Sequence, residues 1–131
     1  MIESTIVEPT TALRDWLRTE ALACGEAVYA GGLPQAVTLP AVTVTAVGGT
    51  VVEPVLEGTY QFDAWADTGP AAASLAGELI SLLVSTPPTV IATGVRFAGA
   101  TCQAPIASPD PSDPDVYRYV VTAQVVTVPT T

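Results

Sequence analysis

Few side chains in this sequence could carry out the common reactions of enzymes. Its 131 residues include no histidine, and its four basic residues are all arginines. The usual general base, catalytic-triad member and zinc ligand are therefore missing. The lysines that form Schiff bases or bind phosphate in P-loops are missing too. We expect this protein to have no enzymatic activity and to need no cofactor or metal.

Carboxylates are the reactive groups that remain, and two of them flank an indole ring. Asp63 and Asp67 lie on either side of Trp65, an arrangement that would suit a sugar platform or the paired acids of a glycosidase. Acidic pairs are also common on acidic surfaces. We favour this second interpretation, in which Asp63 lies on the solvent face of a strand and Asp67 helps to begin the next helix. A small carbohydrate- or ligand-binding domain is the alternative from another functional class.

A second group of acids lies in the sequence Asp-Pro-Ser-Asp-Pro-Asp. Asp110, Asp113 and Asp115 could offer oxygen ligands to a hard cation. The spacing, the glycine and the closing glutamate of an EF-hand are absent, however, and two prolines stiffen the segment. We therefore interpret residues 105–115 as an extended, solvated Pro/Asp loop that binds no metal.

One arginine lies between two tyrosines, close to this acidic loop. Arg118, flanked by Tyr117 and Tyr119, has a side chain that can form an interfacial ion pair or stack on an aromatic ring. An ordinary half-exposed strand arginine explains the same pattern equally well, and both interpretations stay open at this point.

The overall composition indicates a protein that associates with other proteins. Only 13% of the residues are charged, about half the usual ~25%, and the mean hydropathy is +0.45. One small core cannot easily bury so much apolar surface, which favours oligomer interfaces. The net charge of −9 argues against a protein that wraps nucleic acid, because such binding depends on Lys and Arg.

The chain reads as a single domain, residues 1–131, without targeting or membrane segments. Its start has no basic region followed by a long apolar run, so we expect no signal peptide. No stretch approaches 18 uninterrupted apolar residues, so we expect no membrane span. Cys24 and Cys102 are interpreted as small buried hydrophobes rather than a disulfide.

Hydrophobic periodicity predicts an α+β domain with one mixed, mostly antiparallel sheet and two helices packed on one face. The expected helices cover residues 11–24 and 70–85, and the expected strands cover 28–30, 41–47, 55–66, 95–102 and 116–128. Gly25 and the glycine pair at 48–49 are expected to end the elements that precede them.

One predicted strand is longer, and one predicted helix is more apolar, than a compact core of this size requires. Twelve extended residues over 55–66 span about 40 Å, whereas a domain of this size is only about 36 Å across. Such a strand must curl or project, and long strands leave edges that seek partners. Helix 70–85 is apolar beyond one face, with Ile80 and Val84 extending the stripe, so it is either a central core helix or a subunit contact.

The order of these features resembles the tail terminator, or tail-completion, proteins of long-tailed bacteriophages. The resemblance starts with the first helix, residues 40–44 and the glycines at 48–49. It continues through residues 60–66 into the alanine-rich helix from Pro70, and ends with the long strand that contains residues 117–124. It covers nearly the whole chain as a pattern of elements. The chain departs from the family in its lack of lysine and its acidic balance.

The resemblance implies a structural virion protein located at the head–tail junction. Such a protein forms a hexameric ring that caps the tail tube, ends its polymerisation and offers its other face to the head connector. DNA would pass through an acidic lumen without specific binding. A head–tail connector or tail-tube component is the neighbouring alternative. The residues we expect at subunit or partner interfaces are Arg96, Asp110, Asp113, Asp115, Tyr117, Arg118, Tyr119, Ile80 and Val84.

Overall fold

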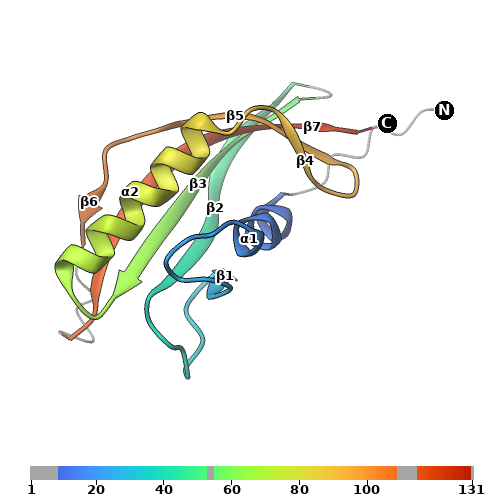
Figure 1. Ribbon diagram of the computed structural model, residues 1–131. Helices are drawn as coiled ribbons and strands as arrows, with labels where there is room; N and C mark the ends of the chain where they lie inside the picture. The colour runs from blue at the N-terminus through green and yellow to red at the C-terminus, as the bar shows by residue number, and fades with distance from the viewer. Residues whose placement is uncertain (1–8, 53–54, 109–114, 131) are drawn as a thin grey trace.

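A curled, seven-stranded mixed sheet with two helices forms the structure, which is a computed structural model describing residues 9–52, 55–108 and 115–130 (Figure 1). Its elements in chain order are α1 (Thr10–Thr19), β1 (Val28–Ala30), β2 (Ala41–Val52), β3 (Val55–Ala66), α2 (Gly69–Ser85), β4 (Thr89–Ala92), β5 (Val95–Cys102), β6 (Ile106–Ala107) and β7 (Tyr117–Pro129). The strand order is β1-β2-β3-β7-β5-β4, and β6 pairs with β7. The α+β class predicted from the sequence is confirmed.

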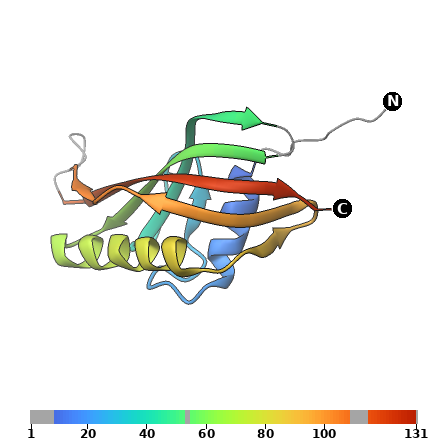
Figure 2. The same cartoon turned by 90° about the horizontal axis from the view of Figure 1, so that it is seen from above.

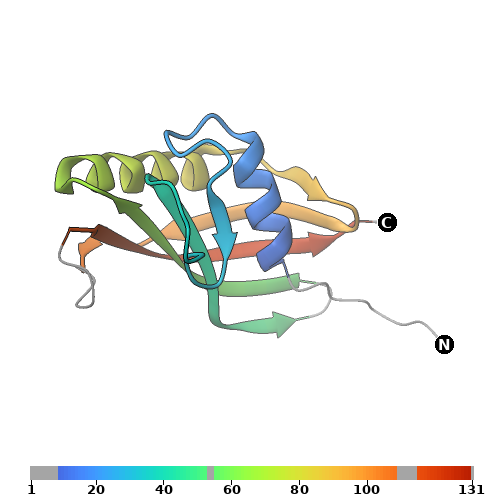
Figure 3. The same cartoon turned by 90° about the horizontal axis from the view of Figure 1, so that it is seen from below.

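The sheet is antiparallel except at one edge, where β1 runs parallel to β2. The long strands β3 and β7 lie at its centre and pair along almost their whole length. Both helices pack on the same face, as predicted, with α1 beneath the β1–β2 side and α2 beneath β7, β3 and β5 (Figure 3). The other face carries no helix among the described residues, and we call it the open face.

Strict alternation along β3 separates the two faces of the sheet. Tyr60, Phe62 and Ala64 point toward the helices and are buried, whereas Gln61 and Asp63 point to the open face. The same alternation continues into β7, because register partners in an antiparallel sheet share a face. The predicted bounds of β3 are confirmed.

The core lies between the helices and the inner face of the sheet. Trp16 of α1 packs against Phe97 of β5, with ring centroids 5.1 Å apart. Each fully buried side chain of this size contributes about 1.5–3 kcal/mol. Besides Trp16, the helices contribute to the core buried leucines at i, i+4 spacing, namely Leu13 and Leu17 of α1 and Leu75, Leu79 and Leu83 of α2.

The first helix is shorter than predicted, and two strands were not predicted: β4, and β6, which lies within the segment 105–115 that was expected to be a loop. Helix α1 ends at Thr19 rather than near residue 24, because Thr19 Oγ1 donates to the carbonyl of Trp16 (2.7 Å) and Glu20 is extended. Turns then bring Leu22 into the core. Strand β4 fills the short interval after the two prolines that follow α2.

Strand β2 does not end at its glycine pair, which corrects the sequence prediction. The register shifts between Ala46 and Gly48, leaving a bulge at Val47, and β2 then continues to Val52 beside β3. Gly49 has a φ of 151° and lies so close to β3 that a Cβ there would be 2.6 Å from the Glu57 carbonyl oxygen. The glycines therefore bend the strand instead of reversing it, and Figure 2 shows β2 turning sharply part-way along its length.

Candidate functional site

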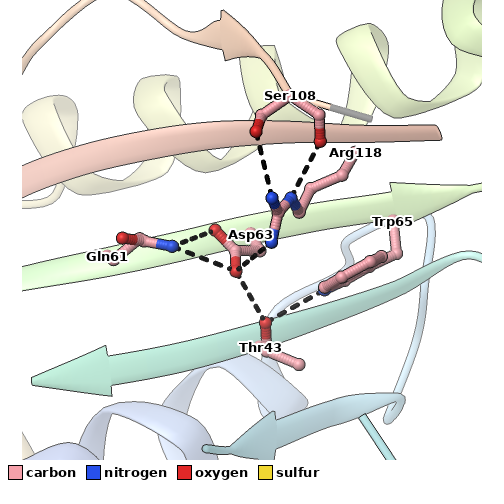
Figure 4. Close-up of polar contacts among 6 residues, drawn as sticks. All are labelled: Thr43, Gln61, Asp63, Trp65, Ser108 and Arg118. Atoms are coloured by element: carbon pink, nitrogen blue, oxygen red, sulfur yellow. Dashed lines mark hydrogen bonds and ion pairs between the residues drawn. The ribbon is translucent and has the colours of Figure 1, made fainter. Parts of the chain in front are cut away.

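Six polar and aromatic side chains gather on the open face, at the end of the sheet where β6 pairs with the first residues of β7 (Figure 4). Strand register brings them together: Thr43 of β2 faces Asp63 of β3, and Trp65 of β3 faces Arg118 of β7. Gln61 and Ser108 complete the group, which we call the Arg118 cluster.

The guanidinium of Arg118 lies at the centre of this cluster. It stacks over Trp65 at 5.1 Å from the ring centroid, and Nη1 lies 3.9 Å from Asp63 Oδ2. Nε donates to the Ser108 carbonyl (2.9 Å) and Nη2 donates to Ser108 Oγ (3.0 Å). A single side chain thus ties β7 to β3 and to the segment that follows β6.

Asp63 is the acid of the cluster, and it is only 6% exposed. Gln61 Nε2 donates to its Oδ1 (3.0 Å), and Thr43 Oγ1 donates to its Oδ2 (3.4 Å). The same threonine hydroxyl accepts a hydrogen bond from Trp65 Nε1 (3.0 Å). Burial raises the pKa of Asp63 above its ordinary value, while Gln61, Arg118 and Thr43 act against that shift.

This geometry corrects two expectations and shows what Arg118 contacts within its own chain. Asp63 lies on the open face but is buried rather than solvated, because side chains of β2, β3 and β7 cover it. Trp65 is 8% exposed and has the guanidinium over its ring, so it offers no platform to a sugar. Arg118 is a partly exposed arginine of β7 that stacks on an aromatic ring of its own chain, and its place at an interface stays a prediction. The contacts of the cluster join β2, β3, β7 and the residues that follow β6.

The residues expected at interfaces are spread over several elements. Arg96 is exposed on β5, where its partners are Val90 and Val128. On α2, Val84 is 53% exposed, whereas Ile80 is half-buried against the core. Their assignment to an interface stays a prediction.

The remaining candidates lie near the start of β7. Tyr117 is 44% exposed and lies beside Gly69 at the first turn of α2, whereas Tyr119 packs against the core. Asp115 is exposed. Asp110 and Asp113 lie outside the described residues. Within the described ranges, no three acidic or cysteine side chains are placed to hold a metal ion. Cys24 and Cys102 are free and half-buried.

The sheet also has two strand edges that sequence reasoning anticipated only in general terms. Strand β1 pairs with residues 42–44 of β2, and no described strand pairs with the outer edge of 45–52. On the opposite side, β4 pairs with residues 95–97 of β5, and no described strand pairs with the outer edge of 99–102. Val47 and Val51 on the free part of β2 are 53% and 51% exposed. These edges leave backbone groups without strand partners among the described residues.

Comparison with known proteins gives a fold match without a family assignment. No family model matches the chain, and no curated protein sequence matches it. Among solved structures, the chain matches one from the virion of a native gene transfer agent particle, with a TM-score of 0.62 and 19% identity. The match covers 92% of this chain and 94% of that one. The chain therefore has the fold of a protein found in that particle. Within the described residues, no helix has both the length and the apolar character needed to cross a membrane.

Proposed function

We propose that this chain is a structural protein of a phage-like particle, without catalytic activity, that forms a ring at the head–tail junction. In this role it caps the tail tube, ends its polymerisation and provides the surface to which the head attaches. The observation that carries the proposal is the fold match, which extends over nearly the full length of both chains and links this fold to a virion.

The surface of the molecule supports assembly from copies of itself. Val47, Val51 and Val84 are each at least half exposed, and two strand edges lack partners among the described residues. Exposed apolar residues beside unpaired backbone groups promote aggregation of a monomer, whereas in an assembly they form the contacts between subunits. In a closed ring built from one repeated heterologous contact, every copy has its exposed valines and its unpaired strand edges covered by neighbours. We propose that the ring contains six copies.

The charge of the chain supports a passage for DNA. A net charge of −9 per copy, repeated around a ring, repels phosphates and offers few cations to hold them. DNA would therefore slide through the lumen without being bound. The tail-tube protein and a head-connector protein are the partners proposed for the two faces of the ring.

A connector or tube component is distinguished from a terminator by what happens when the protein is missing. Particles made without it should have overlong or headless tails in electron micrographs, and supplying the wild-type gene in trans should restore normal length. Filled heads that leak DNA beside tails of normal length would point to a connector component instead. Native mass spectrometry of the purified protein should show a six-copy species; a monomer at tens of micromolar would contradict the ring.

A further inference from the structure

The two free strand edges lie on opposite sides of the sheet but at the same level along it. Register partners define rows across the sheet, and a row that begins on the free part of β2 ends on the free part of β5. Two such rows are Thr50–Glu57–Val126–Gly99 and Gly48–Thr59–Gln124–Thr101. A copy placed beside β5 with its strands at the same level would therefore bring its own free β2 edge against the free β5 edge.

The directions of the strands match this placement. Three successive antiparallel pairings, β2–β3, β3–β7 and β7–β5, make β5 antiparallel to β2. If the sheet continued from one copy into the next, the new β5–β2 pair would also be antiparallel. This is the more frequent kind of strand pair and the one with the straighter hydrogen bonds.

We infer that residues 46–50 of one copy pair with residues 99–102 of the next copy, so that the sheets join edge to edge around the assembly. This inference rests on the proposed function in one respect only, which is that copies of the chain meet one another. It names the segments that meet, and it makes the contact heterologous, because the two edges belong to different strands.

The side chain of Val51 supports this pairing from the helix side. Val51 faces Leu56, so it lies on the face that carries the helices, in the row that runs through Phe97 of β5 to Thr89 of β4, just past the paired residues. Helix α2 starts beside Tyr117 and leads into β4, which pairs with Phe97. Its last turn therefore lies at the same level of the sheet as Val51 of the added copy.

The part of α2 that would receive Val51 is apolar and exposed. Ile80 and Val84, four residues apart, share one flank of the helix, and Val84 is 53% exposed. The opposite flank contacts the α1–β1 segment of the same chain through Glu78 Oε2, which accepts a hydrogen bond from the Ala23 amide (2.9 Å). The Ile80 and Val84 flank thus turns away from α1, toward the β5 side of the sheet. Edge pairing would cover it with the valine of the neighbouring copy.

A matched pair of lysine variants tests the contact. Val51→Lys places a charge at the free edge of β2, where Val51 is 51% exposed. Val90→Lys is the control: Val90 lies on β4, is 53% exposed and pairs with Arg96 of β5. We expect Val51→Lys to raise the concentration at which the assembly dissociates by at least about tenfold, as followed by native mass spectrometry. We expect Val90→Lys to leave it unchanged, and circular dichroism checks that both variants are folded. Equal assembly of wild type and Val51→Lys would overturn the inference.

Cysteine crosslinking identifies the segments directly. In a Cys24→Ser, Cys102→Ala background, Thr50→Cys and Thr101→Cys combined in one chain should give a ladder of covalent multimers with a short bismaleimide. Either cysteine alone should give none, because the position to which it would be crosslinked, two rows away on the same face of the neighbouring copy, would still be a threonine.

The outcomes separate this inference from the proposed function. An intact ring that forms no ladder would overturn edge pairing and leave the ring standing. Crosslinks in the Thr50→Cys variant alone would show β2 pairing with β2, which also overturns it. A wild-type chain that stays monomeric would overturn the ring and this contact together.

Discussion

Replacing Arg118 by alanine should destabilise the monomer fold, because the side chain joins three segments on the open face. The substitution removes the stack on Trp65, both hydrogen bonds to Ser108 and the ion pair with Asp63. It leaves the carboxylate of Asp63 buried, with only the donors from Gln61 and Thr43 to stabilise its charge.

The size of the effect follows from the geometry of the pair. Removing one partner of a fully buried ion pair costs about 3–5 kcal/mol. Here the Arg118 side chain is 24% exposed and the charged atoms are 3.9 Å apart, which lowers the Coulombic part. Losing the stack and the Ser108 bonds adds to the cost. We expect a net loss of about 2–3 kcal/mol in the free energy of unfolding at pH 7, or about 10 °C in Tm for a chain of this length.

Urea unfolding at fixed protein concentration measures this loss, and Arg96→Ala provides the control. Arg96 is an exposed arginine on β5, so its removal should cost no more than about 0.5 kcal/mol. In an Asp63→Asn background, Arg118→Ala should cost at least about 1 kcal/mol less, because no buried charge is left behind. A loss for Arg118→Ala below about 0.5 kcal/mol, or an equal loss in both backgrounds, would refute this account of the cluster.

Three further predictions concern the acid of the cluster, the bent strand and the second helix. Because burial raises the pKa of Asp63, its stability contribution relative to Asp63→Asn should be largest at low pH and should be lost as pH rises from the ordinary aspartate range through the raised value; urea titrations between pH 3.5 and 7 check the sign. Gly49→Ala should cost about 2 kcal/mol, since its Cβ would clash with the Glu57 carbonyl, and amide exchange should rise mainly in the β2–β3 hairpin. Thr68→Ala should cost about 1 kcal/mol, because the Thr68 hydroxyl accepts a hydrogen bond at the start of α2, and thermal unfolding measures it.

Local pattern was enough for the elements with strong periodicity or clear stops. Strand β3 was predicted with the bounds that the structure shows, because alternation runs through it without a break. Helix α2 was predicted within one residue, since Pro70 opens it and two prolines follow it. The pattern gave a wrong prediction at glycine, because glycine is found both in turns and where two backbone segments approach closely. The glycines at 48–49 were interpreted as a turn, but Gly49 allows β2 and β3 to approach closely.

The candidate site depended on information that local pattern does not contain. Asp63, Trp65 and Arg118 were all singled out in the sequence, yet their meeting is set by the register between β3 and β7. The burial of Asp63 follows from that register, because Arg118 covers one side of it and Thr43 of β2 lies on the other. Ser108 carried no signal of its own. It joins the cluster only because β6 pairs with β7.

The central position of β7 has a consequence for how the protein folds during synthesis. This strand follows all the other described strands in the chain, yet it lies between β3 and β5. Until the ribosome releases it, the β1–β2–β3 and β4–β5 portions have no strand to join them. Such late, long-range pairing is slow and leaves apolar edges open to wrong partners. We therefore expect nascent chains that lack β7 to depend on chaperones and to be unable to assemble, so that only completed subunits enter a particle.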